Sequence, residues 1–70
     1  MKGNILGKKL RELRLEQGIS QRRLGEMLGF SNQAVSTWEC GLREPDCDSL
    51  VELAKFFNVS VDFLLGLSEI

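Results

Sequence analysis

The stretch SQRRLGEMLGFSNQAVSTWECG, residues 20–41, decides the fold of this chain. Its apolar residues recur at helical spacing in two blocks, which predicts two helices of about eight residues each. Only a few residues around Gly29 and Phe30 separate the blocks, and a connection this short makes two helices cross steeply. A close crossing requires a small residue on the first helix, and Gly25 lies there.

Both predicted helices carry start and stop signals. Ser20 and Ser31 are expected to be N-caps, because a serine side chain accepts a hydrogen bond from a free amide in the next turn. Gly29 and Gly41 are expected to end the two helices. Five apolar residues should bury the inner faces of these helices: Leu24, Met27, Leu28, Val35 and Trp38.

The apolar pattern predicts three more helices, one before this unit and two after it. The first ends near Gly18, and the fourth follows the loop at Pro45, with Asp48 or Ser49 as its N-cap and Asn58 as its end. A short fifth helix is expected over about residues 61–65, and the absence of strand-like alternation makes the fold class all-α. The stripes of the first and fourth helices are formed by Leu6, Leu10, Leu13, Gln17, Leu50, Leu53, Ala54 and Phe57.

The charged residues divide the chain into two parts. Residues 1–43 contain eight Lys and Arg against four Glu, a balance of +4, and residues 44–70 contain one Lys against six Asp and Glu, a balance of −5. The potential of the basic part, not the net charge of −1, decides whether a polyanion is attracted. Taken alone, this distribution fits a nucleic-acid-binding face and a pair of ordinary solvated surfaces equally well.

The composition argues against a catalytic or metal site. The chain has no His, and Cys40 and Cys47 stand seven residues apart, which is not a tight metal-ligand spacing. We therefore expect no enzyme activity and no cofactor, and we interpret both cysteines as bystander thiols in a reducing cytosol, with a redox role left open. No apolar run approaches the ~20 residues of a membrane span, and the start at Met1 lacks the apolar core of a signal peptide. A cytoplasmic protein without membrane partners is expected.

Residues 20–41 resemble the helix-turn-helix of the Xre family, the lambda-repressor and Cro-like DNA-binding domains. The matching positions are Gln21, Gly25, Gly29, Val35, Trp38, Glu39 and Gly41. The segments LRELRLEQGISQ (residues 10–21) and LVELAKFFNVSVDFLLG (residues 50–66) are similar to the family's first helix and its last two helices. The resemblance covers nearly the whole chain and implies a compact five-helix, lambda-repressor-like domain over residues 1–70.

The resemblance also implies that the helix of residues 31–40 enters the major groove of duplex DNA. Its base-reading positions are Asn32, Gln33, Ser36 and Thr37. Asn and Gln can bond adenine through N6 and N7, and Ser and Thr can bond several base edges or touch a thymine methyl group. The absence of Lys and Arg from residues 31–41 is then no obstacle. The alternative is that these four residues form an ordinary solvated face.

Phosphate contacts must supply most of the affinity for DNA. By the resemblance, Gln21 contacts phosphate from the start of its helix, where free amides also favour an anion, and Arg43 occupies a phosphate-facing loop position. Asn32 and Ser31 could reach phosphate as well. Arg22 and Arg23 depart from the family, which commonly carries Glu where Arg23 stands. We hypothesise that one or both reach phosphate, and the alternative is an exposed surface without a role.

Two further sets of residues are interpreted through the resemblance. Arg14 and Glu39 are expected to pair as a structural clamp and not to touch DNA. Phe63, Leu67 and Ile70 are apolar residues that docking of the fifth helix does not require, although Phe63 could instead fold back into the core. Because the family usually binds palindromes as two-fold dimers, these three are predicted to form a homodimer interface, with half-sites about 34 Å apart.

The sequence therefore predicts a sequence-specific, duplex-DNA-binding transcriptional regulator. The resemblance implies a repressor that binds a palindromic operator as a homodimer and occludes polymerase, and no small-molecule effector is indicated. A rival interpretation is an antitoxin-like protein-interaction module on the same fold with little DNA affinity, supported by the acidic second half of the chain and by the lack of Lys and Arg in the predicted reading helix. Glu44, Asp46 and Asp48, which follow Arg43 closely, would repel a nearby phosphate unless the loop turns them away. A further alternative is that the chain is only the DNA-binding part of a longer repressor.

Overall fold

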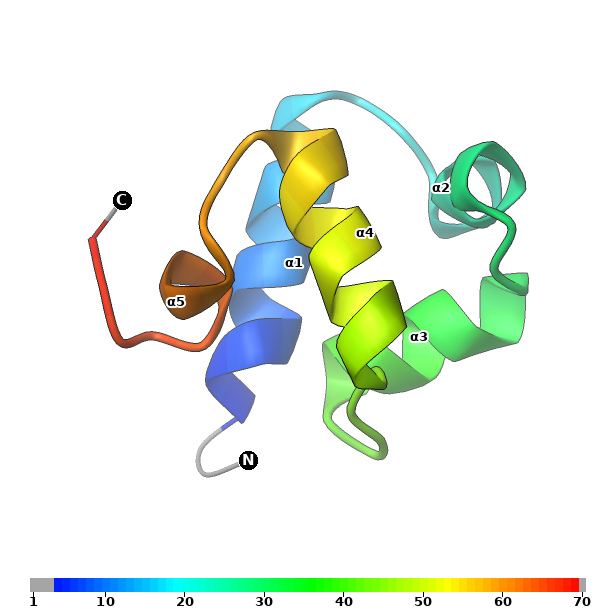
Figure 1. The fold of residues 1–70 in the computed structure, drawn as a ribbon. Helices are drawn as coiled ribbons and strands as arrows, with labels where there is room; N and C mark the ends of the chain where they lie inside the picture. The colour runs from blue at the N-terminus through cyan, green and yellow to red at the C-terminus, as the bar shows by residue number, and fades with distance from the viewer. Residues whose placement is uncertain (1–3, 70) are drawn as a thin grey trace.

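The computed structural model describes residues 4–69 and contains five α-helices (Figure 1). The helices are α1 (Ile5–Glu16), α2 (Gln21–Leu28), α3 (Asn32–Cys40), α4 (Cys47–Phe57) and α5 (Val61–Leu64). Within the described residues there is no strand, so the expected all-α fold with five helices is confirmed.

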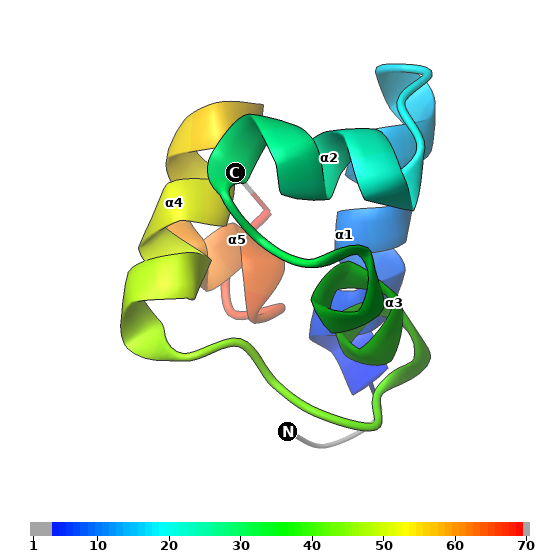
Figure 2. The same ribbon diagram turned by 90° about the vertical axis from the view of Figure 1, so that its right-hand side faces the viewer.

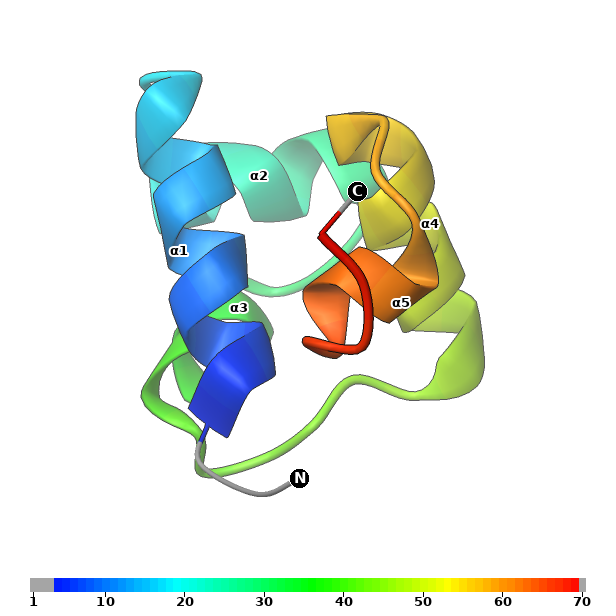
Figure 3. The same cartoon turned by 90° about the vertical axis from the view of Figure 1, so that its left-hand side faces the viewer.

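The helices surround a single core. Figure 2 shows α2 lying across the molecule above α3, which is seen nearly end-on, so these two helices cross steeply as expected. α1 packs against α3, and α5 fills the space between α1 and α4 (Figure 3). Every helix contributes to the buried apolar cluster, which consists of Leu6, Leu10, Leu24, Val35, Trp38, Leu53, Ala54, Phe57 and Leu64.

Met27 does not belong to this core, so its predicted place on the inner face of α2 is wrong. Its side chain is exposed, whereas Leu24 and Gly25 are buried and Leu28 packs against the cluster as a partly buried residue. The backbone of Phe30 lies against Gly25, so the buried side of α2 is the one that carries Leu24 and Gly25. Met27 is thereby left on the flank of the helix.

Asp46, and not Asp48 or Ser49, is the N-cap of α4, so the predicted cap is wrong as well. The Asp46 side chain accepts a hydrogen bond of 2.8 Å from the Ser49 amide, and hydrogen bonding from Ser49 holds the pKa of the Asp46 carboxyl below its ordinary value. With the cap at Asp46, Asp48 falls in the first turn of α4. A negative charge there interacts favourably with the helix dipole. A helix that begins at Cys47 therefore uses the Asp46 carboxylate as its cap and the Asp48 carboxylate in its first turn.

Two glycines allow helices to approach more closely than any side chain would permit. A Cβ atom on Gly25 would lie 2.5 Å from the Phe30 carbonyl oxygen, as the predicted close crossing requires. A Cβ atom on Gly7 would lie 2.6 Å from the carbonyl oxygens of both Trp38 and Glu39. Sequence reasoning did not single out Gly7, because in the sequence it stands inside an ordinary helical pattern. Its place shows that α1 rests directly on the backbone at the end of α3.

Substituting Gly7→Ala should therefore destabilise the domain. Overpacking against backbone that cannot move aside lowers the free energy of unfolding by about 1–3 kcal/mol, even though alanine is the better helix former by roughly 1 kcal/mol. Urea denaturation of the purified chain measures this. Lys8→Ala, at the exposed next position, serves as the control and should change stability by less than about 0.5 kcal/mol. An alanine variant as stable as the parent would show that α1 and α3 are not in close contact.

Candidate nucleic-acid interface

The first turn of α3 presents two free carboxamides to solvent. Ser31 caps the helix by accepting a 3.0 Å hydrogen bond from the Ala34 amide, and Asn32 and Gln33 follow as exposed residues. Neither amide side chain has a hydrogen-bond partner among residues 4–69. In Figure 2, α3 lies nearest the viewer beneath α2, and no other helix covers it.

The next turn of α3 is less open. Ser36 and Thr37 are half-buried, and the Thr37 hydroxyl donates a 2.9 Å hydrogen bond to the Ala34 carbonyl oxygen. The inner side of the helix is anchored by Val35 and Trp38, both buried as predicted. By helical spacing Gln33, Ser36 and Thr37 lie on the side of α3 away from its two core residues, and Asn32 lies on the flank. Asn32 and Gln33 are the most accessible of the four predicted base-reading residues.

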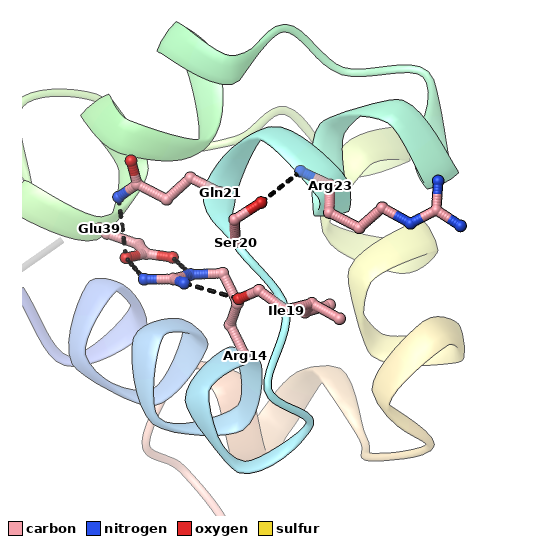
Figure 4. Close-up of polar contacts among 6 residues, drawn as sticks. All are labelled: Arg14, Ile19, Ser20, Gln21, Arg23 and Glu39. Carbon is pink, nitrogen blue, oxygen red and sulfur yellow. Dashed lines mark hydrogen bonds and ion pairs between the residues drawn. The ribbon is translucent and has the colours of Figure 1, made fainter.

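Arg14 and Glu39 form the expected pair, which joins α1 to α3. Arg14 Nε lies 2.6 Å from Glu39 Oε2 and Arg14 Nη2 lies 3.0 Å from Glu39 Oε1, while Arg14 Nη1 donates 2.8 Å to the Ile19 carbonyl oxygen (Figure 4). Both side chains are at least nine-tenths buried. The hydrogen bonds with Glu39 raise the pKa of Arg14, so the guanidinium stays charged despite its burial.

Gln21 belongs to the same network. Its Nε2 donates a 3.1 Å hydrogen bond to Glu39 Oε1, which places the side chain against the clamp (Figure 4). Because Gln21 is the first residue of α2, its backbone amide has no partner within the helix and remains available at the N-terminus. This side-chain contact could not be predicted from the sequence, since no local pattern places residue 21 near residue 39.

Arg22 and Arg23 are exposed in the first turn of α2. Arg22 Nε lies 3.4 Å from one carboxylate oxygen of Glu26, and Arg23 Nη1 lies 3.7 Å from the other. Exposed pairs of this kind contribute little to stability, so both guanidinium groups can exchange partners readily. The Ser20 side chain accepts a 2.9 Å hydrogen bond from the Arg23 amide, which confirms the predicted cap, while the Arg23 side chain points away from Gln21 (Figure 4).

Arg43 lies exposed in the loop that follows α3. The loop is tied to the helix because the amides of Leu42 and Arg43 donate to the Thr37 carbonyl oxygen, at 3.0 and 3.4 Å. Arg43 is therefore held near the C-terminal end of α3, while Asn32 and Gln33 mark its N-terminal end. The acids Glu44 and Asp46 are exposed as well, so charges of both signs border this end of the interface.

Two of the three predicted dimer residues lie beside a surface hollow between α1 and α5. Phe63 is half-buried beneath the amine of Lys9, whose nitrogen lies 4.4 Å from the ring centre. Leu67 is 75% exposed, and Ile5 on α1 lines the same hollow with 39% of its surface exposed. Ile70 lies outside the described residues.

Other kinds of site are not evident between residues 4 and 69. Cys40 and Cys47 are free and exposed thiols. In this part of the chain no three acidic, cysteine or histidine side chains gather where they could hold a metal ion. None of the helices described here has the length and apolar character needed to cross a bilayer.

The chain belongs to the helix-turn-helix family, whose sequence model matches residues 10–64. It is 42% identical over 65 residues to the HTH-type transcriptional regulator ImmR of Bacillus subtilis (strain 168), a match covering 93% of this chain and 51% of ImmR. It is 38% identical over 65 residues to repressor protein C2 of Salmonella phage P22, covering 93% of this chain and 30% of the repressor. The chain thus spans about half or less of the length of these relatives.

Solved structures of the P22 repressor share the fold. The crystal structure of the P22 c2 repressor with synthetic operator 9T superimposes with a TM-score of 0.85 and 38% identity, covering 91% of this chain and 97% of that one. The solution structure of the DNA-binding domain of the same repressor gives a TM-score of 0.81. These matches confirm the resemblance to the lambda-repressor-like domains, and the relatives are regulators of transcription, not enzymes.

Removing one partner of the Arg14–Glu39 pair should unfold the domain, so its effect on stability comes before any effect on DNA contacts. Glu39→Ala leaves the buried guanidinium of Arg14 without its main partner, which lowers the free energy of unfolding by about 3–5 kcal/mol. The matched control is Glu26→Ala, which removes a carboxylate paired with two arginines on an exposed surface and should cost no more than about 1 kcal/mol. Thermal and urea unfolding compare the two variants. Equal losses would mean that the clamp does not anchor α3.

Proposed function

We propose that this chain is a DNA-binding domain that recognises duplex DNA sequence-specifically and regulates transcription as a repressor. One observation carries the proposal. The chain, with the exposed face of α3 held on it by the Arg14–Glu39 clamp, superimposes over 91% of its length, at 38% identity and a TM-score of 0.85, on a repressor solved with its operator. In this role α3 enters the major groove, and occlusion of polymerase in the cytoplasm would produce repression.

The four outward residues of α3 would read the bases. Asn32 and Gln33, exposed and unbonded, would reach farthest into the groove, while Ser36 and Thr37 would meet the bases one turn later. None of them is required to hold the core. A single change at Gln33 should therefore alter recognition without unfolding the domain.

Phosphates would be held on both sides of that face. The backbone amide of Gln21 suits a phosphate at the start of α2, since its side chain is bonded to Glu39. The hydroxyl of Ser31 accepts from the Ala34 amide and can still donate its own proton to a phosphate. Arg22, Arg23 and Arg43 would supply positive charge, each from an exposed position.

Selection from a randomised duplex pool at two salt concentrations tests the function directly. We expect an enriched palindrome whose recovery is lost with Gln33→Ala, because truncation removes a base contact worth about 1–3 kcal/mol of discrimination. Retention without enrichment, or no retention even at low salt, would overturn the proposal. The acidic residues of the α4 region would then favour the protein-interaction module.

The salt dependence of DNA binding tests the arginines of α2. Arg22→Ala combined with Arg23→Ala should lower the slope of log affinity against log salt by about one to two, since each lost phosphate contact removes roughly one released counterion. Lys55→Ala, which removes an exposed cation from α4, should leave the slope unchanged. An unchanged slope in the double variant would exclude these arginines from the interface. The single variants separate them, because Arg23 points away from Gln21.

We also propose that the chain binds its operator as a homodimer through Phe63, Leu67 and Ile70. The exposed Leu67 and Ile5 beside the hollow between α1 and α5 support this. Sedimentation should show Leu67→Glu shifting the chain toward monomer. Leu42→Glu is the matched control, because Leu42 is an equally exposed leucine in the loop after α3. A parent chain that remains monomeric at high concentration, with and without DNA, would exclude the dimer.

A further inference from the structure

We infer that Glu26 sets the strength of DNA binding by competing with phosphate for Arg22 and Arg23. The inference rests on the proposed function and assigns a role to a carboxylate that the DNA interface does not itself use. In this role Glu26 is a positioning residue that does not touch DNA. It keeps the affinity for duplexes of every sequence below the value that the two arginines alone would give.

One carboxylate serves both arginines. Arg22 Nε lies 3.4 Å from Glu26 Oε2, and Arg23 Nη1 lies 3.7 Å from Glu26 Oε1, so each oxygen faces one guanidinium group. These three are the only charged side chains of α2, and Glu26 lowers the charge of the helix from +2 to +1. An arginine that binds a phosphate must therefore leave its place beside Glu26 or share it.

The start of α2 makes this competition unfavourable for binding in a second way. Arg22 and Arg23 stand in the first turn of α2, where the positive end of the helix dipole disfavours cations, and Glu26 offsets that repulsion in the free protein. When a phosphate takes over the two arginines, Glu26 loses both partners and is left near another negative charge. Both effects lower the affinity for DNA.

The separations show that Glu26 attracts the arginines without fixing their orientation. A charge-assisted hydrogen bond between a guanidinium group and a carboxylate measures about 2.7–2.9 Å, and Arg14 approaches Glu39 to 2.6 Å in the interior. The two contacts of Glu26 are longer, and all three of their side chains are more than half exposed. Glu26 therefore does not hold the guanidinium groups ready for a phosphate, and its effect on binding is competition.

Substituting Glu26→Gln tests this directly, because glutamine keeps the size and the helix propensity of glutamate and removes its charge. Affinity at low salt should rise by about twofold to tenfold, as the weakness of exposed pairs allows. The gain should be equal for a selected duplex and for an unrelated duplex of the same length, since phosphate contacts carry no sequence information. It should shrink at higher salt. The matched control is Glu52→Gln, which removes an exposed carboxylate from α4 and should change the affinity less.

The same substitution in a chain that carries Arg22→Ala and Arg23→Ala identifies the mechanism. Glu26 has no arginine to hold there, so Glu26→Gln should raise the affinity no more than Glu52→Gln does. An equal gain in both backgrounds would mean simple repulsion between Glu26 and DNA, and an unchanged or weaker affinity in the parent background would mean that Glu26 does not compete. A gain limited to the selected duplex would mean that Glu26 affects base reading. Each of these three results overturns the inference and leaves the proposed function standing. A parent chain that retains no duplex at either salt concentration overturns the proposed function itself, and the inference with it.

Discussion

The ion pair between Arg14 and Glu39 is the contact on which the arrangement of the helices depends. It joins the last turn of α1 to the end of α3, and Gln21 adds the start of α2 to the same carboxylate. Arg14 also bonds the Ile19 carbonyl oxygen, which fixes the connection between α1 and α2. A pair this deeply buried loses much of its hydration, and its geometry compensates because every charged oxygen has a partner. Three helices are thus positioned by one polar cluster within an otherwise apolar core.

The burial of Glu39 in this cluster leaves the outer face of α3 without charge, although arginines lie near both of its ends. Glu39 is the only charged residue of α3, and its charge is neutralised in the interior. The cations at Arg22, Arg23 and Arg43 lie at the start of α2 and in the loop after α3, outside the face that α3 presents. Under the proposed function, attraction to a polyanion and discrimination between its bases would fall to different elements, which is the division that phosphate and base contacts require.

Most of the fold followed from local patterns, and, apart from the N-cap of α4, the misses depend on how distant parts of the chain meet. Helix positions, the caps at Ser20 and Ser31, and the glycine at the crossing of α2 could be predicted because each depends on neighbours within a few residues. Met27 was misplaced because its burial depends on the angle between α2 and the following turn. The role of Gly7 and the bond from Gln21 to Glu39 escaped prediction since they join residues distant in sequence. The Arg14–Glu39 contact is equally distant, and only the family resemblance made it predictable.

The backbone contacts of Gly7 and Gly25 have a consequence for how such domains change over time. The turn before α3 meets Gly25, and the carbonyl groups at its far end meet Gly7, so α3 is located at both ends by main-chain atoms. Val35, Trp38 and Glu39 anchor it from within, and none of these contacts uses the outward side chains at positions 32, 33 and 36. Those positions can therefore vary with little penalty to folding. A duplicated gene could acquire a new target by a few substitutions there while it inherits an intact scaffold, which makes divergence of targets inexpensive for this architecture.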